Sequence, residues 1–112
     1  MNRAKPLSVK FYRTKAGHEP VRDWLRSLNR AEKKTIGEDI KTIQFGWPLG
    51  MPLVRKLDRD LWEARISLGS RIGRVLFTVR GSVIVLLHGF IKKSQKIPPQ
   101  DLATTRRRLN TL

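Results

Sequence analysis

Three consecutive apolar segments, separated by short glycine-containing turns, constrain the fold of this chain more than any other feature. Leu61–Leu68 and Arg74–Arg80 alternate apolar and polar residues, which predicts strands that each bury one face. Ser82–Phe90 is apolar almost throughout, as expected of a central strand covered on both faces. Gly69–Gly73 and Gly81-Ser82 join these segments, and such short connections favour antiparallel neighbours. The second half of the chain therefore predicts a mostly antiparallel sheet.

The chain begins with the patterns of one strand and one helix. Leu7–Tyr12 alternates apolar and polar residues, which predicts a first strand. Pro20 stands where a helix would begin, a position that tolerates its missing N–H. The residues that follow at helical spacing form one apolar stripe: Val21, Trp24, Leu25 and Leu28. We expect Trp24 and Leu25 to lie in the core, where this helix meets the sheet.

A second helix follows after a very short connection. Asn29 and Glu32 have the spacing of a capping box, in which each side chain caps the other residue's backbone N–H. Its apolar stripe consists of Ile36, Ile40 and Ile43, and Gly46 with Trp47-Pro48 ends it. Two helices joined so tightly predict an antiparallel helical hairpin.

The complete order predicts an α+β fold. A Gly- and Pro-rich loop leads to a short extended piece at Leu53–Leu57, and a short basic helix over Gln100–Leu109 closes the chain. The expected order is β-α-α-β-β-β-α, with a mostly antiparallel sheet and the helical hairpin packed on it. A length of 112 residues predicts one domain over residues 1–112. We expect Trp62 in the core, and Trp47 as the tryptophan available to a partner.

The charge is large and uneven. The chain has 24 Lys and Arg against 9 Asp and Glu, a formal net charge of +15. Residues 1–54 hold 11 basic and 5 acidic residues, whereas residues 64–112 hold 10 basic residues and one acid, Asp101. Such a field concentrates phosphates near the protein and accelerates their association. The sequence therefore predicts a polyanionic partner, a nucleic acid or the ribosome.

Several classes of protein lack support in the sequence. No apolar run reaches the roughly 18 residues that a membrane span needs, and no secretory leader is visible, so we expect a cytoplasmic protein without a membrane partner. The absence of cysteine excludes disulfides and thiolate-bound metals. With two histidines and no phosphate-cradling glycine loop, we expect no metal and no cofactor. Metal hydrolases, NTPases and dehydrogenases are thereby disfavoured.

Arginine and lysine side chains on the predicted strands are the remaining candidates for functional residues. Arg65 and Arg74 lie on consecutive strands, opposite the apolar faces. If helices cover those apolar faces, the other face becomes a concave, basic and partly open surface. Phe90, Lys92 and Lys93 end the last strand and can reach the same surface. Rigid strands hold guanidinium groups well, and their planar fork suits phosphate oxygens. The alternative is a set of ordinary solvent-facing residues on an uncovered sheet face.

Four strings in this region carry a family resemblance. They are Lys56-Leu57, Leu61-Trp62-Glu63-Ala64-Arg65, Arg74-Val75-Leu76-Phe77, and Leu86-Leu87-His88-Gly89-Phe90-Ile91-Lys92-Lys93-Ser94-Gln95-Lys96 followed by Pro98-Pro99. In this order the chain resembles a HigB-type toxin, one of the phage-derived toxins of the RelE/ParE toxin–antitoxin superfamily. The resemblance runs from the first strand to the last helix.

The resemblance implies a ribosome-dependent mRNA endonuclease. Such toxins of type II toxin–antitoxin systems enter the A site of the 70S ribosome and cut the bound message, which blocks translation. It also implies a cognate antitoxin, commonly a HigA-like protein with a helix-turn-helix domain, that covers the basic surface or keeps the toxin off the ribosome.

The implied chemistry needs no metal. The 2′-OH of RNA attacks the adjacent phosphate and leaves a 2′,3′-cyclic phosphate and a 5′-OH, which requires a base, stabilisation of charge and an acid. By motif position, the resemblance makes Arg65 and Arg74 the phosphate clamp. Lys93, or Lys92, would stabilise charge or protonate the leaving group. Phe90 would stack on a base.

The general base is left open. RelE has a lysine-rich strand and a C-terminal tyrosine, whereas here Glu63 replaces one of those lysines and Pro99 stands near the tyrosine position. Glu63 is one candidate base, and its alternative is an ion pair that orients Arg65. Histidine ionises near neutral pH, but the apolar strand around His88 favours a core or supporting role. The candidates for substrate binding are Lys56, His88, Phe90 and Lys92.

Two other functions fit the same scaffold. One is a ParE-like inhibitor that poisons DNA gyrase by binding, and the other is a non-catalytic basic RNA-binding phage accessory protein. A ParE-like mode needs no phosphate clamp, so Arg65, Arg74 and Lys93 favour the nuclease. For Arg106-Arg107-Arg108 the alternatives are a solvated helix face, a contact with ribosomal RNA and an antitoxin-binding segment.

Overall fold

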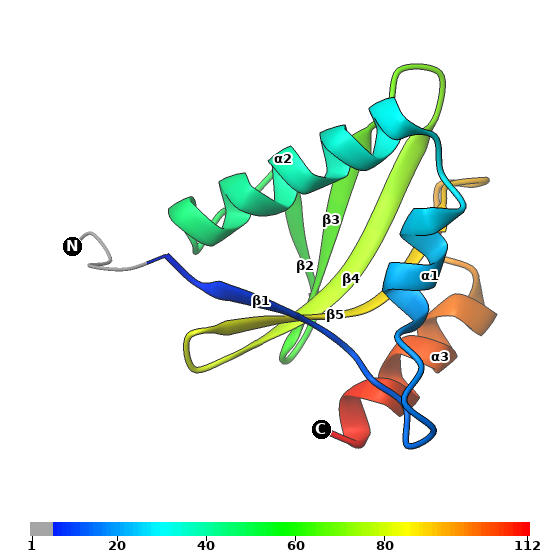
Figure 1. The fold of residues 1–112 in the computed structure, drawn as a ribbon. Coiled ribbons are helices and arrows are strands. Elements are labelled where there is room, and N and C mark those ends of the chain that lie inside the picture. The colour runs from blue at the N-terminus through cyan, green and yellow to red at the C-terminus, as the bar shows by residue number, and fades with distance from the viewer. Residues whose placement is uncertain (1–5) are drawn as a thin grey trace.

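The computed structural model describes residues 6–112, which form a five-stranded sheet with three helices (Figure 1). The elements are β1 (Ser8–Phe11), α1 (Pro20–Arg26), α2 (Arg30–Gly46), β2 (Val54–Asp58), β3 (Leu61–Ser67), β4 (Ile72–Arg80), β5 (Val83–Ile91) and α3 (Pro99–Asn110). The strand order is β1-β5-β4-β3-β2. The first strand runs parallel to β5 and the other three pairings are antiparallel. The α+β class is confirmed, with a mixed sheet.

The predicted order of elements is wrong at one place. The short extended piece expected at Leu53–Leu57 is the full strand β2, so four strands, not three, follow the helices. It pairs with β3 along its length, from Val54 opposite Ala64 to Asp58 opposite Leu61. Alternation over five residues at a sheet edge is weak, because only Val54 there is fully buried. Pairing with β3, rather than local pattern, makes this segment a strand.

The predicted helical hairpin is also wrong. The second helix packs on β3, whereas α1 packs on β5 and β1, and the two helix axes diverge across the sheet (Figure 1). With seven residues, α1 is too short to form a long contact with its neighbour. Its position is set by Trp24, whose ring lies directly on Gly89 of β5, where a Cβ atom would clash. The short connection therefore turns the chain across the sheet instead of reversing it.

The other expectations for the helices are confirmed. The side chains of Ile36, Ile40 and Ile43 are buried, and Trp24 and Leu25 pack against the same core. The capping box is present: Asn29 Oδ1 accepts from Glu32 N at 2.8 Å, and Glu32 Oε1 accepts from Asn29 N at 3.2 Å. These contacts begin α2 at the residue that the sequence indicates.

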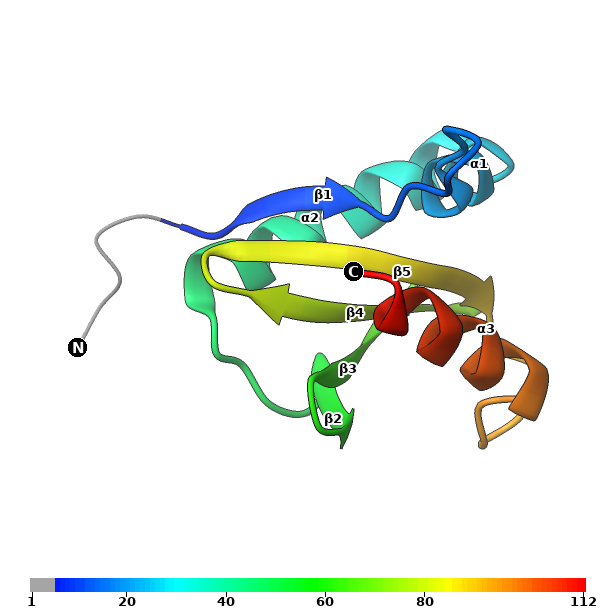
Figure 2. The ribbon, with the colours of Figure 1, turned by 90° about the horizontal axis from the view of Figure 1, so that it is seen from below.

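The sheet lies between two unequal layers, as Figure 2 shows: α1 and α2 cover one face and α3 covers part of the other. We call these the helix-pair face and the α3 face. The larger core fills the helix-pair face. A smaller cluster fills the α3 face, with four fully or nearly buried side chains: Leu61, Leu76, Val85 and Leu87. Central strand β5 contributes to both, as its apolar sequence predicts.

Trp47 lies on the helix-pair face, where it is partly buried against the core instead of standing free in the loop. Its ring makes edge contacts with Trp62 at 5.1 Å and with Phe77 at 5.7 Å between centroids. Trp62 packs against the core, as expected. The loop after α2 folds back onto the sheet because three aromatic rings pack together there. In the part of the chain that is described, no helix has the length and apolar character needed to cross a membrane.

Candidate functional site

Four charged side chains gather on the α3 face, and we call them the arginine cluster: Arg55, Arg65, Arg74 and the carboxylate Glu63. Residue alternation along β3 directs Glu63 and Arg65 to the face opposite Ala64 and the main core. Strand register then joins them to their neighbours, because Glu63 lies opposite Arg55 of β2 and Arg65 lies opposite Arg74 of β4. Three adjacent strands therefore contribute to one group of charges.

The carboxylate at the centre of the cluster is fully buried. Glu63 Oε1 lies 3.4 Å from Arg55 Nε, and Glu63 Oε2 lies 3.2 Å from Arg74 Nε. Arg74 is itself only 2% exposed. A buried charge is tolerated only when it is paired. Glu63 can therefore be buried because the two arginines offset the cost of removing its carboxylate from water. Glu63 is thus ion-paired, but with Arg55 and Arg74, and the expected pair with Arg65 is not among the ion pairs of residues 6–112.

The predicted open surface is wrong at Glu63 and Arg74, because the chain after β5 folds over this face. The carbonyl of Gln95, in the loop between β5 and α3, accepts a hydrogen bond from Arg74 Nη2 at 2.9 Å. Arg65 is partly exposed and the Arg55 side chain is 44% exposed. The cluster therefore has a buried part, Glu63 and Arg74, which we call its floor, and two arginines at the surface, Arg55 and Arg65.

The cluster carries more positive charge and more donors than its own atoms use. Three guanidinium groups against one carboxylate leave two positive charges uncompensated. Within residues 6–112, three nitrogens of the cluster are buried without a hydrogen-bond partner, Arg74 Nη1, Arg74 Nε and Arg65 Nε, and so are both carboxylate oxygens of Glu63. Burial lowers the pKa of Arg74 below the usual arginine value; Glu63 opposes this shift, and Arg65 and Arg55 add to it. Planar donors with excess positive charge suit an oxyanion such as phosphate.

Arg55 is the functional candidate that sequence reasoning missed. Its strand was expected only as a short extended piece, so no register connected Arg55 to Glu63. The one available signal was the alternation of Val54 and Lys56 with Arg55 and Leu57, which places Arg55 on the same face as Leu57 of the smaller cluster. A strand assignment for residues 54–58 would have been needed to use it.

Lys92 and Lys93 are the first two residues of the connection between β5 and α3. Lys92 Nζ approaches Gln95 Oε1 at 3.5 Å, so Lys92 and Arg74 contact the same residue. Lys93 is exposed and lines a neighbouring cleft of about 470 Å³ together with Phe90 and His88. Phe90 lies directly opposite Arg74 in the register of β4 and β5. The structure therefore places Phe90 and Lys92 beside the arginine cluster, and Lys93 on the neighbouring cleft.

His88 fastens α3 to the sheet. A register shift beside Leu87 places His88 opposite Leu76, on the α3 face. Its Nε2 lies 2.7 Å from Asp101 Oδ1, and its Nδ1 lies 3.3 Å from Arg108 Nη1. Because an arginine only donates, Nδ1 is the acceptor and Nε2 donates to Asp101. Both ring nitrogens are engaged within the chain, which matches the supporting role expected for His88.

Helix α3 carries three consecutive arginines at positions 106–108, and two of them form contacts within the chain. Arg108 Nη1 donates to Leu87 O at 2.7 Å, and burial lowers the pKa of Arg108 below the usual value. Arg106 Nη1 forms an ion pair with Asp58 Oδ2 at 2.7 Å. Arg107 is exposed. Only part of the basic triple is therefore a solvated helix face.

Residues 23–110, which include the whole arginine cluster and α3, match the family model described as "Phage derived protein Gp49-like (DUF891)". The chain belongs to this Gp49-like family. No curated protein matches the sequence. The resemblance to phage-derived toxins is thus confirmed at the level of a phage-derived family.

Lys56 is the one candidate that the Gp49-like fold places elsewhere. It lies opposite Trp62 in the register of β2 and β3, on the helix-pair face. Its Nζ lies 5.7 Å from the centroid of the Trp62 ring, a cation–π contact. Alternation separates Lys56 from Arg55, its neighbour in sequence, by the thickness of the sheet. In residues 6–112, no group of three or more His, Asp or Glu side chains is placed to hold a metal ion.

Proposed function

We propose that this Gp49-like protein is the toxin of a type II toxin–antitoxin module and that it cleaves mRNA on the ribosome without a metal. The arginine cluster is the observation that carries the proposal. Attack of the 2′-OH on the adjacent phosphate passes through a phosphorane that is more negatively charged than the diester. Preformed donors with two uncompensated positive charges stabilise such a state more than the ground state.

The buried floor and the surface arginines have different roles in this proposal. Arg65 and Arg55 reach solvent and contact the phosphate oxygens, and Arg74 donates from below. Glu63 is a positioning residue: it holds the Nε atoms of Arg55 and Arg74 from inside the sheet and does not touch the substrate. Its full burial argues against the alternative in which Glu63 is the general base.

Two residues near the cluster have the remaining roles, stacking on a base and donating a proton to the leaving group. Phe90 stacks on a base beside the phosphate, because it lies opposite Arg74 and is partly exposed. Lys93, exposed beside Phe90, gives a proton to the leaving 5′-oxygen. The 2′-OH gives its proton to solvent water, the 2′-oxygen becomes bonded to phosphorus and the P–O5′ bond breaks, which yields a 2′,3′-cyclic phosphate and a free 5′-OH.

The positive charge outside the cluster binds the two partners, the ribosome and the antitoxin. Contacts between exposed arginines and ribosomal RNA phosphates hold the toxin in the A site, in the cytoplasm, and a cognate antitoxin with an acidic or mixed segment neutralises the same face. Ribosome affinity is then expected to fall steeply between low and high salt. An affinity that does not change with salt would contradict this part of the proposal.

The decisive experiment is in-vitro translation followed by primer extension on the message. Wild-type protein is expected to produce cuts in the A-site codon only when ribosomes are present. The new 5′ ends should accept phosphate from polynucleotide kinase without prior phosphatase treatment, because they carry 5′-OH. Arg65→Ala is expected to lower the cleavage rate about 10²- to 10³-fold, the usual loss when one charge-stabilising donor is removed.

Matched variants separate chemistry from folding. Arg80→Ala removes an exposed arginine from the far end of β4, outside the cluster, and should lower cleavage far less than Arg65→Ala. Arg74→Lys keeps the charge beside Glu63 but loses the planar fork, so the protein should fold and cleave more slowly. Absence of cuts together with gyrase-dependent DNA breaks would overturn the proposal in favour of a ParE-like inhibitor. RNA binding with neither effect would indicate a non-catalytic binding protein.

A further inference from the structure

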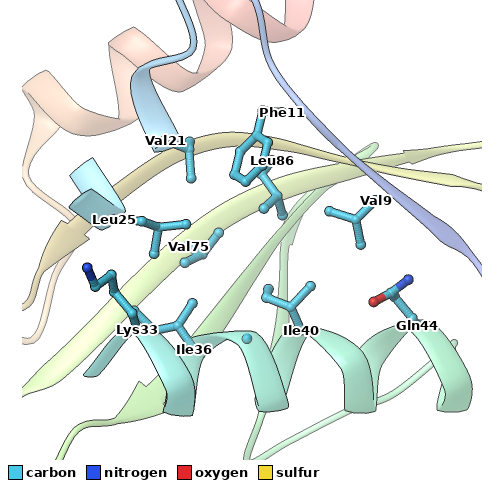
Figure 3. A pocket seen from close by; sticks show the side chains of 11 residues that line it. Val9, Phe11, Val21, Leu25, Lys33, Ile36, Ile40, Gln44, Val75 and Leu86 are labelled. Atoms are coloured by element: carbon cyan, nitrogen blue, oxygen red, sulfur yellow. The ribbon is translucent and has the colours of Figure 1, made fainter. Parts of the chain in front are cut away.

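The helix-pair face contains an apolar cleft that the proposed reaction does not use. It has a volume of about 260 Å³ and lies between α2, α1 and β1 (Figure 3). Its lining is apolar apart from Lys33 and Gln44, and Val9, Ile36, Gly37 and Ile40 are part of it. The sheet separates this cleft from the arginine cluster.

The walls of the cleft are held by the fold itself. At one end, Leu7 N donates to Gln44 O at 3.0 Å and Gln44 Nε2 donates to Leu7 O at 2.7 Å, which ties α2 to the start of β1. At the other end, Val21 of α1 is buried against the main core. A cleft with both ends fixed is preformed, so a partner does not have to open it.

Gly37 keeps the cleft accessible. It lies in the interior of α2, where glycine is less favourable than alanine, and it has no positive φ that would require glycine. A Cβ atom at this position would meet no heavy atom within 4 Å. Neither backbone conformation nor close packing explains the glycine. A larger side chain here would extend over the lining of the cleft.

The size and charge of the cleft indicate its occupant. A cavity of about 150 Å³ already accepts a benzene ring, so this cleft can hold one large apolar side chain. Among the described residues that line it, Lys33 is the ionisable one. Nearby, the guanidinium carbon of Arg22 lies 4.7 Å from the centroid of the Phe11 ring, but its Nε forms an ion pair with Glu19 Oε1 at 2.8 Å. The charge of Lys33 is therefore the one that the lining offers to a partner, in a chain of net charge +15.

We propose that the cleft is a docking site for a partner protein that inserts one large apolar side chain carried on an acidic segment. This site is independent of the proposed nuclease, because it lies on the other face of the sheet and shares no residue with the arginine cluster. A partner bound here leaves that cluster uncovered.

The test uses three six-residue peptides and the methyl resonances of the full-length protein. The probes are Glu-Glu-Phe-Leu-Glu-Glu, the same peptide with lysine in place of glutamate, and the same acidic peptide with Gly-Gly in place of Phe-Leu. The first is expected to shift the methyl signals of Ile36, Ile40 and Val9 in a saturable manner. The other two are expected to bind at least tenfold more weakly at these methyl groups.

Variants of α2 locate the binding. Gly37→Leu should weaken binding of the acidic apolar peptide at least tenfold, whereas Lys34→Leu, an exposed neighbour outside the cleft, should not. Gly37→Ala should raise the melting temperature and keep most of the binding, so it also reports on folding. Lys33→Glu should reverse the preference between acidic and basic peptides without filling the cleft.

Four outcomes would overturn the proposal. These are the absence of methyl shifts with every peptide, equal binding of the basic peptide, equal binding of the Gly-Gly peptide, and unchanged binding in Gly37→Leu. Shifts confined to the α3 face would show that acidic peptides bind only the arginine cluster. Shifts that depend on protein concentration without peptide would assign the cleft to a second copy of the chain. Either result also rejects the acidic partner, and none of these outcomes bears on the nuclease.

Discussion

The two faces of the sheet are built from the same strands but use opposite chemistry. On the helix-pair face the buried strand residues are apolar, for example Ala64, Val75 and Phe77. On the α3 face the buried apolar residues alternate with Glu63, Arg74 and Thr78. Apolar residues of similar volume can usually replace a buried ion pair without loss of stability. Under the proposed function, the helix-pair face serves stability, whereas the α3 face retains charge to bind phosphate.

The strand pleat allows the two faces to differ so completely. Successive side chains of a strand point to opposite faces, so a substitution at Ala64 and one at Glu63 affect different layers. The register of β2, β3 and β4 then brings together the charged residues that point to the α3 face. Variants on each face should therefore have separable effects on stability and on cleavage.

The largest effect is expected at the centre of the charged face. Glu63→Ala leaves the buried guanidinium of Arg74 without its carboxylate, and loss of one partner of a buried pair costs about 3–5 kcal/mol. We expect the free energy of unfolding, measured by urea denaturation, to fall by this amount. Glu38→Ala, at an exposed position of α2, is the control and should change stability by less than about 0.5 kcal/mol. Equal stability of both variants would remove the distinction between the faces.

A comparable loss is expected on the helix-pair face, but without an effect on function. Ile43 is fully buried on the face of α2 that packs on the sheet, and Ile43→Ala removes apolar contacts and leaves a cavity at a cost of about 2–5 kcal/mol. Its exposed neighbour provides the control variant Thr42→Ala. At a temperature where both variants are folded, ribosome-dependent cleavage should equal that of the wild type. A reduced cleavage rate in folded Ile43→Ala would show that the two faces are coupled.

A smaller effect is expected at the polar margin of the helix-pair face. Asn29 caps α2, and loss of an N-cap side chain typically costs about 1 kcal/mol. Asn29→Ala should lower the free energy of unfolding by this amount, whereas Asn29→Asp should retain most of it. Equal losses in the two variants would indicate that the cap does not contribute through its side-chain oxygen.

The smallest effect is expected in how the free energy of unfolding changes at acidic pH. Arg71 donates to both carboxylate oxygens of Glu32, at 2.7 and 2.9 Å, and this pairing lowers the pKa of Glu32 below its model-peptide value of 4.5. A lowered folded-state pKa contributes stability above pH 4.5 that is lost as the pH falls through the folded value. Urea denaturation of wild type and Arg71→Met should therefore differ at pH 7 and converge as the pH falls below 4.5. A difference that does not depend on pH would contradict this linkage.

Local patterns were sufficient to predict most elements of this fold. The capping box of Asn29 and Glu32 and the stripe through Ile36, Ile40 and Ile43 predicted α2, because these interactions are formed within one helix. Alternation predicted β3 and β4, and the apolar run predicted the doubly covered β5. The path of α1 was not predicted, because it depends on the contact between Trp24 and Gly89, which are 65 positions apart.

The sequence by itself determined the composition of the two faces, the excess of basic residues in its second half and the presence of arginines on consecutive strands. The tertiary structure alone decided that Glu63 and Arg74 are buried, that Arg55 joins them and that Lys56 lies on the other face. The physical reason is that periodicity specifies which side of a strand a residue occupies, whereas register and the covering layer specify its neighbours and its exposure. The charge of the arginine cluster was visible in the sequence, but its geometry required the sheet.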